Sequence, residues 1–237
     1  TDVNEFGKLA ALSREVIESP TVSLDFTYYV VDGKNENTLG FQTNGSTSAL
    51  SGIMAQNSSA AEKNYYILTV PEGEDATRTT AYDNAKNGTI GVGNGYITSY
   101  GITASVGDIP SASVSVEASN LRFDTKSSGV TNPAIKVTDG SAVSGSTVNI
   151  PLSSTGTLSA AALRPGDVSI NFGTSKLQVG GAILPGMQTT ATETTANVQN
   201  FSLDLPLSRT PLNRIGNAFP FSRELDFPIN ATLSVPA

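Results

Sequence analysis

The stretch from Ile97 to Ala118, ITSYGITASVGDIPSASVSVEA, decides the fold of this chain. Apolar and small polar residues alternate up to Val106, and they alternate again from Ser111 onward. A period of two places successive side chains on opposite faces of a β-strand. Gly107 and the corner Asp108-Ile109-Pro110 separate the two runs. The pattern therefore predicts two antiparallel strands joined by a tight corner.

A second segment, residues 198–237, is a distant copy of the first. Its opening run VQNFSLDLPL ends at Leu207, where the first copy ends at Val106. Asp226-Phe227-Pro228 repeats the corner, and both copies close on Ser-Val-x-Ala. Such a repeat reproduces a packing surface and no reactive group. We interpret it as a sign of quasi-symmetric building blocks rather than of an active site.

Most of the remaining chain also has the period of a β-strand. Val22 to Val30 alternates and is followed by the turn residues Asp32-Gly33. The long strands are expected at Thr89 to Val106 and Ser111 to Arg122. Further strands are expected at residues 38–43, 49–55, 64–70, 134–137, 146–152, 167–172, 176–179, 197–207 and 225–235. One amphipathic helix is expected near the start, from Val3, Phe6, Leu9, Leu12, Val16 and Ile17.

These patterns predict a mainly β protein, an antiparallel β-sandwich or barrel with a short N-terminal helix. The repeat raises the prospect of two related modules. The predicted boundaries are residues 1–20 for the helix or arm, 21–124 for the first module and 125–237 for the second. A joint rich in Ser, Gly, Asn and Pro, from Thr125 to Pro133, separates the modules.

An insertion distinguishes the second copy. Residues 208–225 stand where the first copy has only Gly107. Thr210-Pro211 and Gly216 predict one helical turn within it. The insertion concentrates the interface candidates Arg209, Arg214, Ile215, Phe219, Phe221 and Arg223. Arginine and aromatic side chains often anchor protein interfaces, so we predict a contact with a neighbouring subunit. The alternative is a loop folded back on its own domain.

Composition limits the chemistry that the chain can perform. Its 237 residues include no Cys, His or Trp. Histidine bases, Ser-His-Asp and Cys-His nucleophiles and the usual zinc ligand sets are therefore excluded. An enzyme would depend on carboxylates, Lys, Tyr or Ser-Lys pairs, and a carboxylate-dependent hydrolase stays open as an alternative. No catalytic, cofactor-binding or metal-binding residue is predicted. The chain has no long apolar run, so no membrane span and no signal peptide are expected in it.

Charge is distributed unevenly along the chain. Residues 1–124 carry 15 acids and 7 bases, whereas residues 125–237 carry 6 acids and 7 bases, for a net charge of −7. Such asymmetry favours head-to-tail association, or an acidic surface past which a polyanion moves without binding. The plainer alternative is a solvated acidic surface. No basic stripe is visible, which disfavours specific nucleic-acid binding.

Two local motifs are read as structural. Gly91-Val92-Gly93-Asn94-Gly95 resembles a phosphate-binding loop, but a strand pattern follows it where a helix is required. A β-strand or bulge is the better interpretation. Glu72, Glu74 and Asp75 offer oxygen ligands, yet their spacing fits no complete calcium loop. We expect a solvated acidic turn there.

Several of these segments resemble virion structural proteins of tailed bacteriophages, and most closely tail tube proteins. The resemblance rests on NYYILTV (64–70) with the acidic turn after it, on the Gly-rich run 91–96 leading into the first copy, and on residues 201–235. It covers residues 22–237 through patterns of strands and corners.

The resemblance implies two packed antiparallel sheets and a flanking helix in a subunit that assembles into rings. Stacked rings form the tube through which genome DNA passes during ejection, without specific binding. It implies no enzymatic activity, no cofactor, no membrane, and contacts with other tail proteins such as sheath, terminator or baseplate. The expected location is the virion tail, after synthesis in the host bacterial cytoplasm. The ring is expected to be a hexamer, or a trimer if each subunit carries two modules.

Two alternatives to a tube subunit stay open. One is another virion part, namely a tail terminator, a baseplate ring protein or a capsid decoration protein. The other is a bacterial surface β-module.

Overall fold

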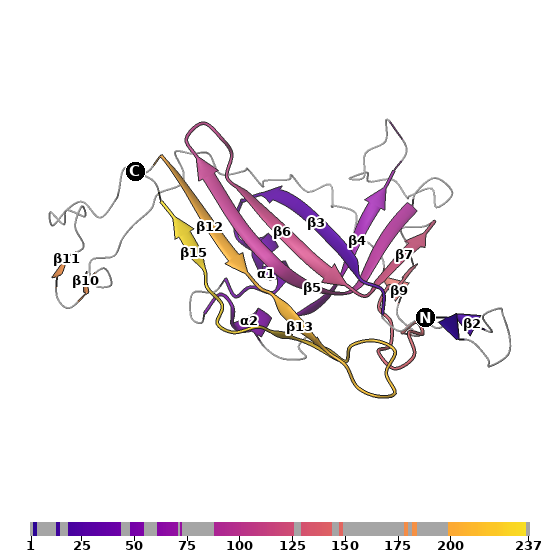
Figure 1. Ribbon diagram of the computed structural model, residues 1–237. Coiled ribbons are helices and arrows are strands. Elements are labelled where there is room, and N and C mark those ends of the chain that lie inside the picture. Colours follow the sequence, from indigo (N-terminus) through magenta and orange to yellow (C-terminus); the bar gives the residue numbers. More distant parts are fainter. Residues whose placement is uncertain are drawn as a thin grey trace.

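The structure is a computed structural model of the chain. It describes residues 19–43, 48–54, 61–70, 72, 88–125, 129–143 and 199–235, and the backbone of short strand pairs at residues 2–3, 13–14, 147–148, 178–179 and 182–183. The described part is mainly antiparallel β-structure, which confirms the predicted fold class at that level. Its centre is a seven-stranded sheet (Figure 1).

One long strand, β5 (Gly88–Ser105), organises this sheet. Its first half pairs with β4 (Glu62–Thr69) on one side and β7 (Asn120–Asp124) on the other. Its second half pairs with β6 (Ser111–Ala118) and β12 (Asn200–Pro206). β3 (Val22–Tyr29) extends the sheet beyond β6, and β15 (Thr232–Ser234) extends it beyond β12. The predicted hairpin of the first copy is confirmed as β5 and β6.

The repeat is visible in the strand register. Ile102 lies four residues before Val106, and its equivalent Leu203 lies four residues before Leu207. These two residues face each other across β5 and β12. The amide of Val106 donates to the carbonyl of Gln199, and the amide of Leu207 donates to that of Thr98. A local two-fold axis between Ile102 and Leu203 therefore relates the two copies.

Strands from both predicted modules thus belong to one sheet. β12 and β15 come from residues beyond the predicted boundary at 125, and they pair with β5 from the first module. The joint does not separate two sheets among the described residues. Segment 129–143 instead lies against the first half of β5, with β8 (Val130–Thr131) paired to β9 (Thr147–Val148).

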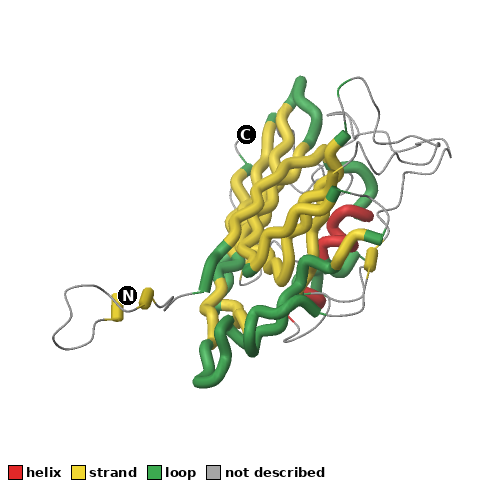
Figure 2. The backbone as a smooth tube through the Cα atoms, turned by 90° about the vertical axis from the view of Figure 1, so that its right-hand side faces the viewer, coloured by secondary structure: helices red, strands yellow, loops and turns green. Residues whose placement is uncertain are grey.

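The main core lies on one face of the second half of the sheet. It contains Leu39, Phe41, Ile53, Ile97, Tyr100, Ala112, Val114, Val116, Leu205 and Leu207. Two short helices, α1 (Lys34–Leu39) and α2 (Ser51–Met54), cover this face (Figure 2). The ring of Phe41 packs against that of Tyr100, with centroids 4.7 Å apart. Burial of these apolar side chains is the main stabilising contribution to this half of the protein.

The strands predicted at residues 38–43 and 49–55 are wrong, because α1 and α2 occupy parts of both segments. Gly40 ends α1 in the left-handed conformation, and its amide donates to the carbonyls of Asn37 and Glu36. This turn sends Leu39 and Phe41 into the core. Leu39 and Phe41 are two positions apart, the spacing of residues on one face of a strand, and this spacing led to the wrong prediction.

The predicted bulge in the Gly-rich run is confirmed. The register of β4 and β5 shifts opposite Gly93 and Asn94, and Asn94 has a φ of 55°. A Cβ atom at Gly93 would collide with the backbone of Pro133. The glycines therefore allow segment 129–143 to approach the strand closely, which is a packing role.

The predicted N-terminal helix is wrong for residues 2–3 and 13–14, which the structure describes as strands. β1 (Asp2–Val3) pairs in antiparallel fashion with β2 (Ser13–Arg14), which is incompatible with one helix over both segments. The other predicted helical residues before Ser19 lie outside the described residues. So does the predicted strand at residues 167–172. A second short pair joins β10 (Gln178–Val179) and β11 (Ala182–Ile183).

Candidate assembly surfaces

The inserted segment is a β-hairpin. β13 (Arg209–Leu212) pairs with β14 (Ser222–Leu225), so the helical turn predicted from Thr210-Pro211 is wrong. The hydroxyl of Thr210 donates to the carboxylate of Asp226 across the base of the hairpin at 2.6 Å, instead of capping a helix. The amide of Phe221 donates to the carbonyl of Leu212 near the tip. Cross-strand bonds at both ends hold the extended conformation.

Arg209 anchors this hairpin inside the subunit. Its guanidinium donates to the carbonyls of Ile97, Arg223 and Ile53 at 3.3, 2.9 and 3.4 Å. It also lies over the ring of Tyr96, with Cζ 5.1 Å from the centroid. Burial lowers the pKa of this guanidinium, while Tyr96 and Glu224 favour its charged form. The side chain is thus committed to contacts within its own chain.

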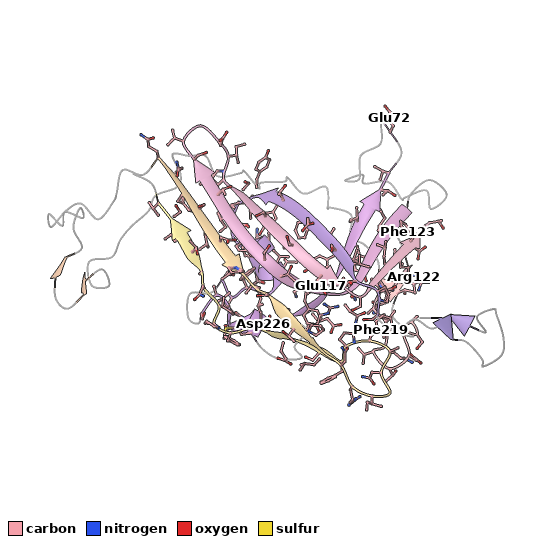
Figure 3. The ribbon with its side chains drawn as sticks, viewed as in Figure 1. Glu72, Glu117, Arg122, Phe123, Phe219 and Asp226 are labelled. Carbon is pink, nitrogen blue, oxygen red and sulfur yellow. The ribbon has the colours of Figure 1, made fainter. Side chains whose placement is uncertain are left out.

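Arg223 is the second internal anchor. It is 6% exposed, and its guanidinium forms an ion pair with Glu117 of β6. Figure 3 places Glu117 at the middle of the molecule, where the hairpin meets the sheet. A buried charge needs such a partner, because leaving it unpaired would cost several kcal/mol, about 3 to 5. For Arg209 and Arg223 the contacts match the predicted alternative, a loop folded back on its own domain.

The tip of the hairpin has a different character. Ile215 is 103% exposed and Phe221 is 42% exposed. Arg214 is exposed, lies over the ring of Phe221 at 5.5 Å and donates to the side chain of Asn217 at 3.5 Å. Phe219 is half-buried beside Gly140, and its amide donates to the carbonyl of Val137. Of the six predicted interface residues, Arg214, Ile215 and Phe221 are the ones that remain available to a partner.

A polar sheet surface, which we call the polar face, lies opposite the main core. Its residues face one another in register across five strands. They are Asp25, Thr27, Tyr29, Ser99, Gly101, Thr103, Ser105, Ser111, Ser113, Ser115, Asn200, Ser202, Asp204, Thr232 and Ser234. These positions include two carboxylates and no Lys or Arg. Residues of both copies contribute, so the repeat generates one continuous surface.

The other half of the sheet exposes apolar residues. Ile67, Ile90 and Phe123 face one another across β4, β5 and β7, and Leu121 lies in the adjacent row. Ile67, Leu121 and Phe123 are 41%, 44% and 72% exposed. Figure 3 shows Phe123 toward one end of the sheet. We call these four residues the apolar patch. Exposed apolar groups of this kind mark protein contact sites more often than single scattered ones.

The two halves of the sheet are therefore covered on opposite faces. Tyr65, on the same side of β4 as Ile67, packs against Phe26, and both side chains pack against the main core. Gly91, on the opposite side of β5 from Ile90, faces Pro133. Helices α1 and α2 protect the core side of one half, and segment 129–143 protects the reverse side of the other. The polar face and the apolar patch are what this arrangement leaves open.

Two acid-tyrosine clusters support the sheet. The hydroxyls of Tyr28 and Tyr100 donate to the same oxygen of Glu36, at 2.9 and 3.1 Å. Tyr96 donates to Glu62 at 2.8 Å. Burial raises the pKa of Tyr28, Tyr96 and Tyr100, and it raises that of Tyr65 to about 12. These phenols stay protonated at neutral pH and act as hydrogen-bond donors.

The described residues provide neither a metal site nor a membrane-spanning helix. Within the described ranges, no group of three or more Asp and Glu side chains lies close enough together to hold a metal ion. Glu72 is exposed, while Glu74 and Asp75 lie outside these ranges. No helix among the described residues has the length and apolar character needed to cross a bilayer.

Sequence reasoning missed the polar face and the apolar patch. The signal for the polar face was present in SASVSV (111–116), where every second residue is Ser. The apolar patch could not be predicted from the sequence, because the exposure of its residues depends on which face of the sheet segment 129–143 covers. Comparisons with family models and with curated proteins found no match to this chain.

Proposed function

We propose that this protein is a structural subunit that assembles with copies of itself into rings, stacked as the tail tube of a bacteriophage. The observation that carries the proposal is the polar face, an open five-stranded surface of small polar side chains with two carboxylates. In a ring, this face would line the channel. Asp25 and Asp204 would repel the phosphates of passing DNA, and the positions that define the face carry no Lys or Arg that would bind them.

The edges of the sheet suit the same role. Among the described strands, β3 pairs only with β6 and β15 pairs only with β12, so both ends of the five-stranded path are unpaired. Unpaired edges invite another chain to continue the sheet. The apolar patch adds a second surface that association with another copy would remove from water. These features support self-association, and no catalytic step is assigned to them.

Electron microscopy of the purified protein tests the proposal. We expect hollow rings, or tubes of uniform width. A decoration protein would stay discrete without its shell, and a surface module or a hydrolase would stay discrete under all conditions. Discrete particles across protein concentration, salt and pH would overturn the proposal.

The chain has no cysteine, so single cysteines can report which face lines the channel. We expect Ser113→Cys on the polar face to react with a bulky maleimide in the free subunit and to be protected in the tube. Asn35→Cys, on the exposed side of α1, is the matched control and should react in both states. Equal labelling of both positions in tubes would show that the polar face does not line the channel.

A further inference from the structure

A surface hollow lies beside the corner of the first copy. It has a volume of about 470 Å³, and its lining includes Tyr29, Thr103, Asp108, Ile109 and Ser111. Tyr29 is 58% exposed and Ile109 is 46% exposed, so the hollow offers apolar surface to solvent. Asp108 is exposed and accepts a hydrogen bond from Ser105 at 3.0 Å. The hollow thus has a mainly polar lining, in which Tyr29 and Ile109 supply apolar groups and Asp108 supplies one carboxylate.

The tip of the inserted hairpin has the complementary composition. Ile215 projects fully into solvent, and Arg214 beside it carries a positive charge. Residues 208–223 contain three arginines and no acid. Arg209 and Arg223 are used inside the subunit, which leaves Arg214 as the charge available at the tip.

The hollow and the tip lie at opposite ends of the molecule. The corner between β5 and β6 is at one end of the sheet, and the β13–β14 hairpin extends from the other end in both views (Figures 1 and 2). Both belong to the side of the polar face. Tyr29, Thr103 and Ser111 of the hollow are polar-face residues, and Glu117, which holds the hairpin, faces Ser23 on the same side of the sheet. Translation of a second copy along the strands would bring its tip to the hollow of the first.

We infer that the hairpin tip of one copy docks into the hollow of the next, with Ile215 against Tyr29 and Ile109 and with Arg214 paired to Asp108. The occupant is a second copy of this chain, and the argument for it is the opposite charge and the exposed apolar groups at the two ends. Because the two surfaces differ, the contact is heterologous, and copies related by translation along the strands repeat it without closing into a ring. The inference rests on the proposed function and identifies the contact between successive rings.

Charge reversal tests this contact. Asp108→Lys and Arg214→Glu each place like charges together, so each should raise the protein concentration required for tube formation at least about tenfold. The double variant restores opposite charges and should recover tubes. A mixture of the two single variants should also assemble, since each supplies the surface that the other needs. Sedimentation and electron microscopy measure tube formation, and thermal unfolding verifies that each variant is folded.

Glu72→Lys is the charge-matched control for Asp108→Lys, because it makes the same change in net charge at another exposed loop (Figure 3). Tube formation by either single variant at the concentration that suffices for Glu72→Lys would overturn the inference, as would failure of both the double variant and the mixture. Failure of the unmodified protein to form rings would instead count against the proposed function. Ile215→Ser should weaken stacking without disrupting single rings.

Discussion

The two copies of the strand-corner-strand motif share a register but differ in the course of the chain after the first strand. Val106 directly follows that strand in the first copy and is 72% exposed, whereas its equivalent Leu207 is fully buried. The first chain turns at once and returns as β6, which pairs with β5 on one side and β3 on the other. The second chain continues into the β13–β14 hairpin and returns as β15, an exposed strand of three residues.

This difference shows that a local pattern specifies a strand pair but not its surroundings. β6 places Ala112, Val114 and Val116 in the core because α1 and α2 cover that part of the sheet. β15 has no such cover, and its residues are all exposed. The first copy therefore supplies core and scaffold. The second supplies a sheet edge and the arm that we assign to assembly.

The largest expected effect on stability distinguishes the equivalent positions Leu207 and Val106. Leu207→Ala should lower the free energy of unfolding by about 3 kcal/mol, because it removes a fully buried side chain and leaves a cavity. Val106→Ala at the equivalent position should change it by less than about 0.5 kcal/mol, since the side chain is already in water. Urea denaturation, performed below the concentration of assembly, measures both values. Similar losses for the two variants would contradict the contrast between the copies.

The second prediction concerns the connection between the copies. Arg223→Ala should lower the free energy of unfolding by about 2 kcal/mol, because Glu117 of the first copy would lose its charged hydrogen-bond partner. Arg214→Ala should leave stability within about 0.5 kcal/mol, because that side chain is exposed. The same denaturation experiment measures both. A stable Arg223→Ala variant would mean that the hairpin is not anchored to β6.

The hairpin of the first copy was predictable because its signal is local. The alternation in ITSYGITASV and SASVSVEA fixes both strands, and the corner between them is short. The strand pattern after the Gly-rich run was also sufficient to reject a phosphate site there. Where an element follows one period over most of its length, sequence and structure agree.

The errors arose where distant contacts decide the local structure. Segment 34–43 contains Leu39 and Phe41 at strand spacing, yet Gly40 and the core behind it produce a helix end. Arg209 stays a predicted interface residue, but the sequence did not show its contacts inside the subunit. Its carbonyl partners on Ile97 and Ile53 are more than 100 residues away, so its internal role was not visible.

The smallest expected effect tests a single hydroxyl that distinguishes the copies. Tyr100 in the first copy is equivalent to Phe201 in the second, and of these two only Tyr100 has a hydroxyl, which donates to Glu36. Tyr100→Phe should cost about 1 kcal/mol of unfolding free energy at neutral pH, the usual value of one such bond.

Burial raises the folded-state pKa of Tyr100, so the unfolded chain releases this proton first as pH rises. The stabilisation by Tyr100 is then complete at neutral pH and declines above about pH 10, the ordinary pKa of tyrosine. In denaturation experiments at increasing pH, the difference in free energy of unfolding between the unmodified protein and Tyr100→Phe should therefore decrease. A difference that stays constant to alkaline pH would show that the hydroxyl is not held in this site.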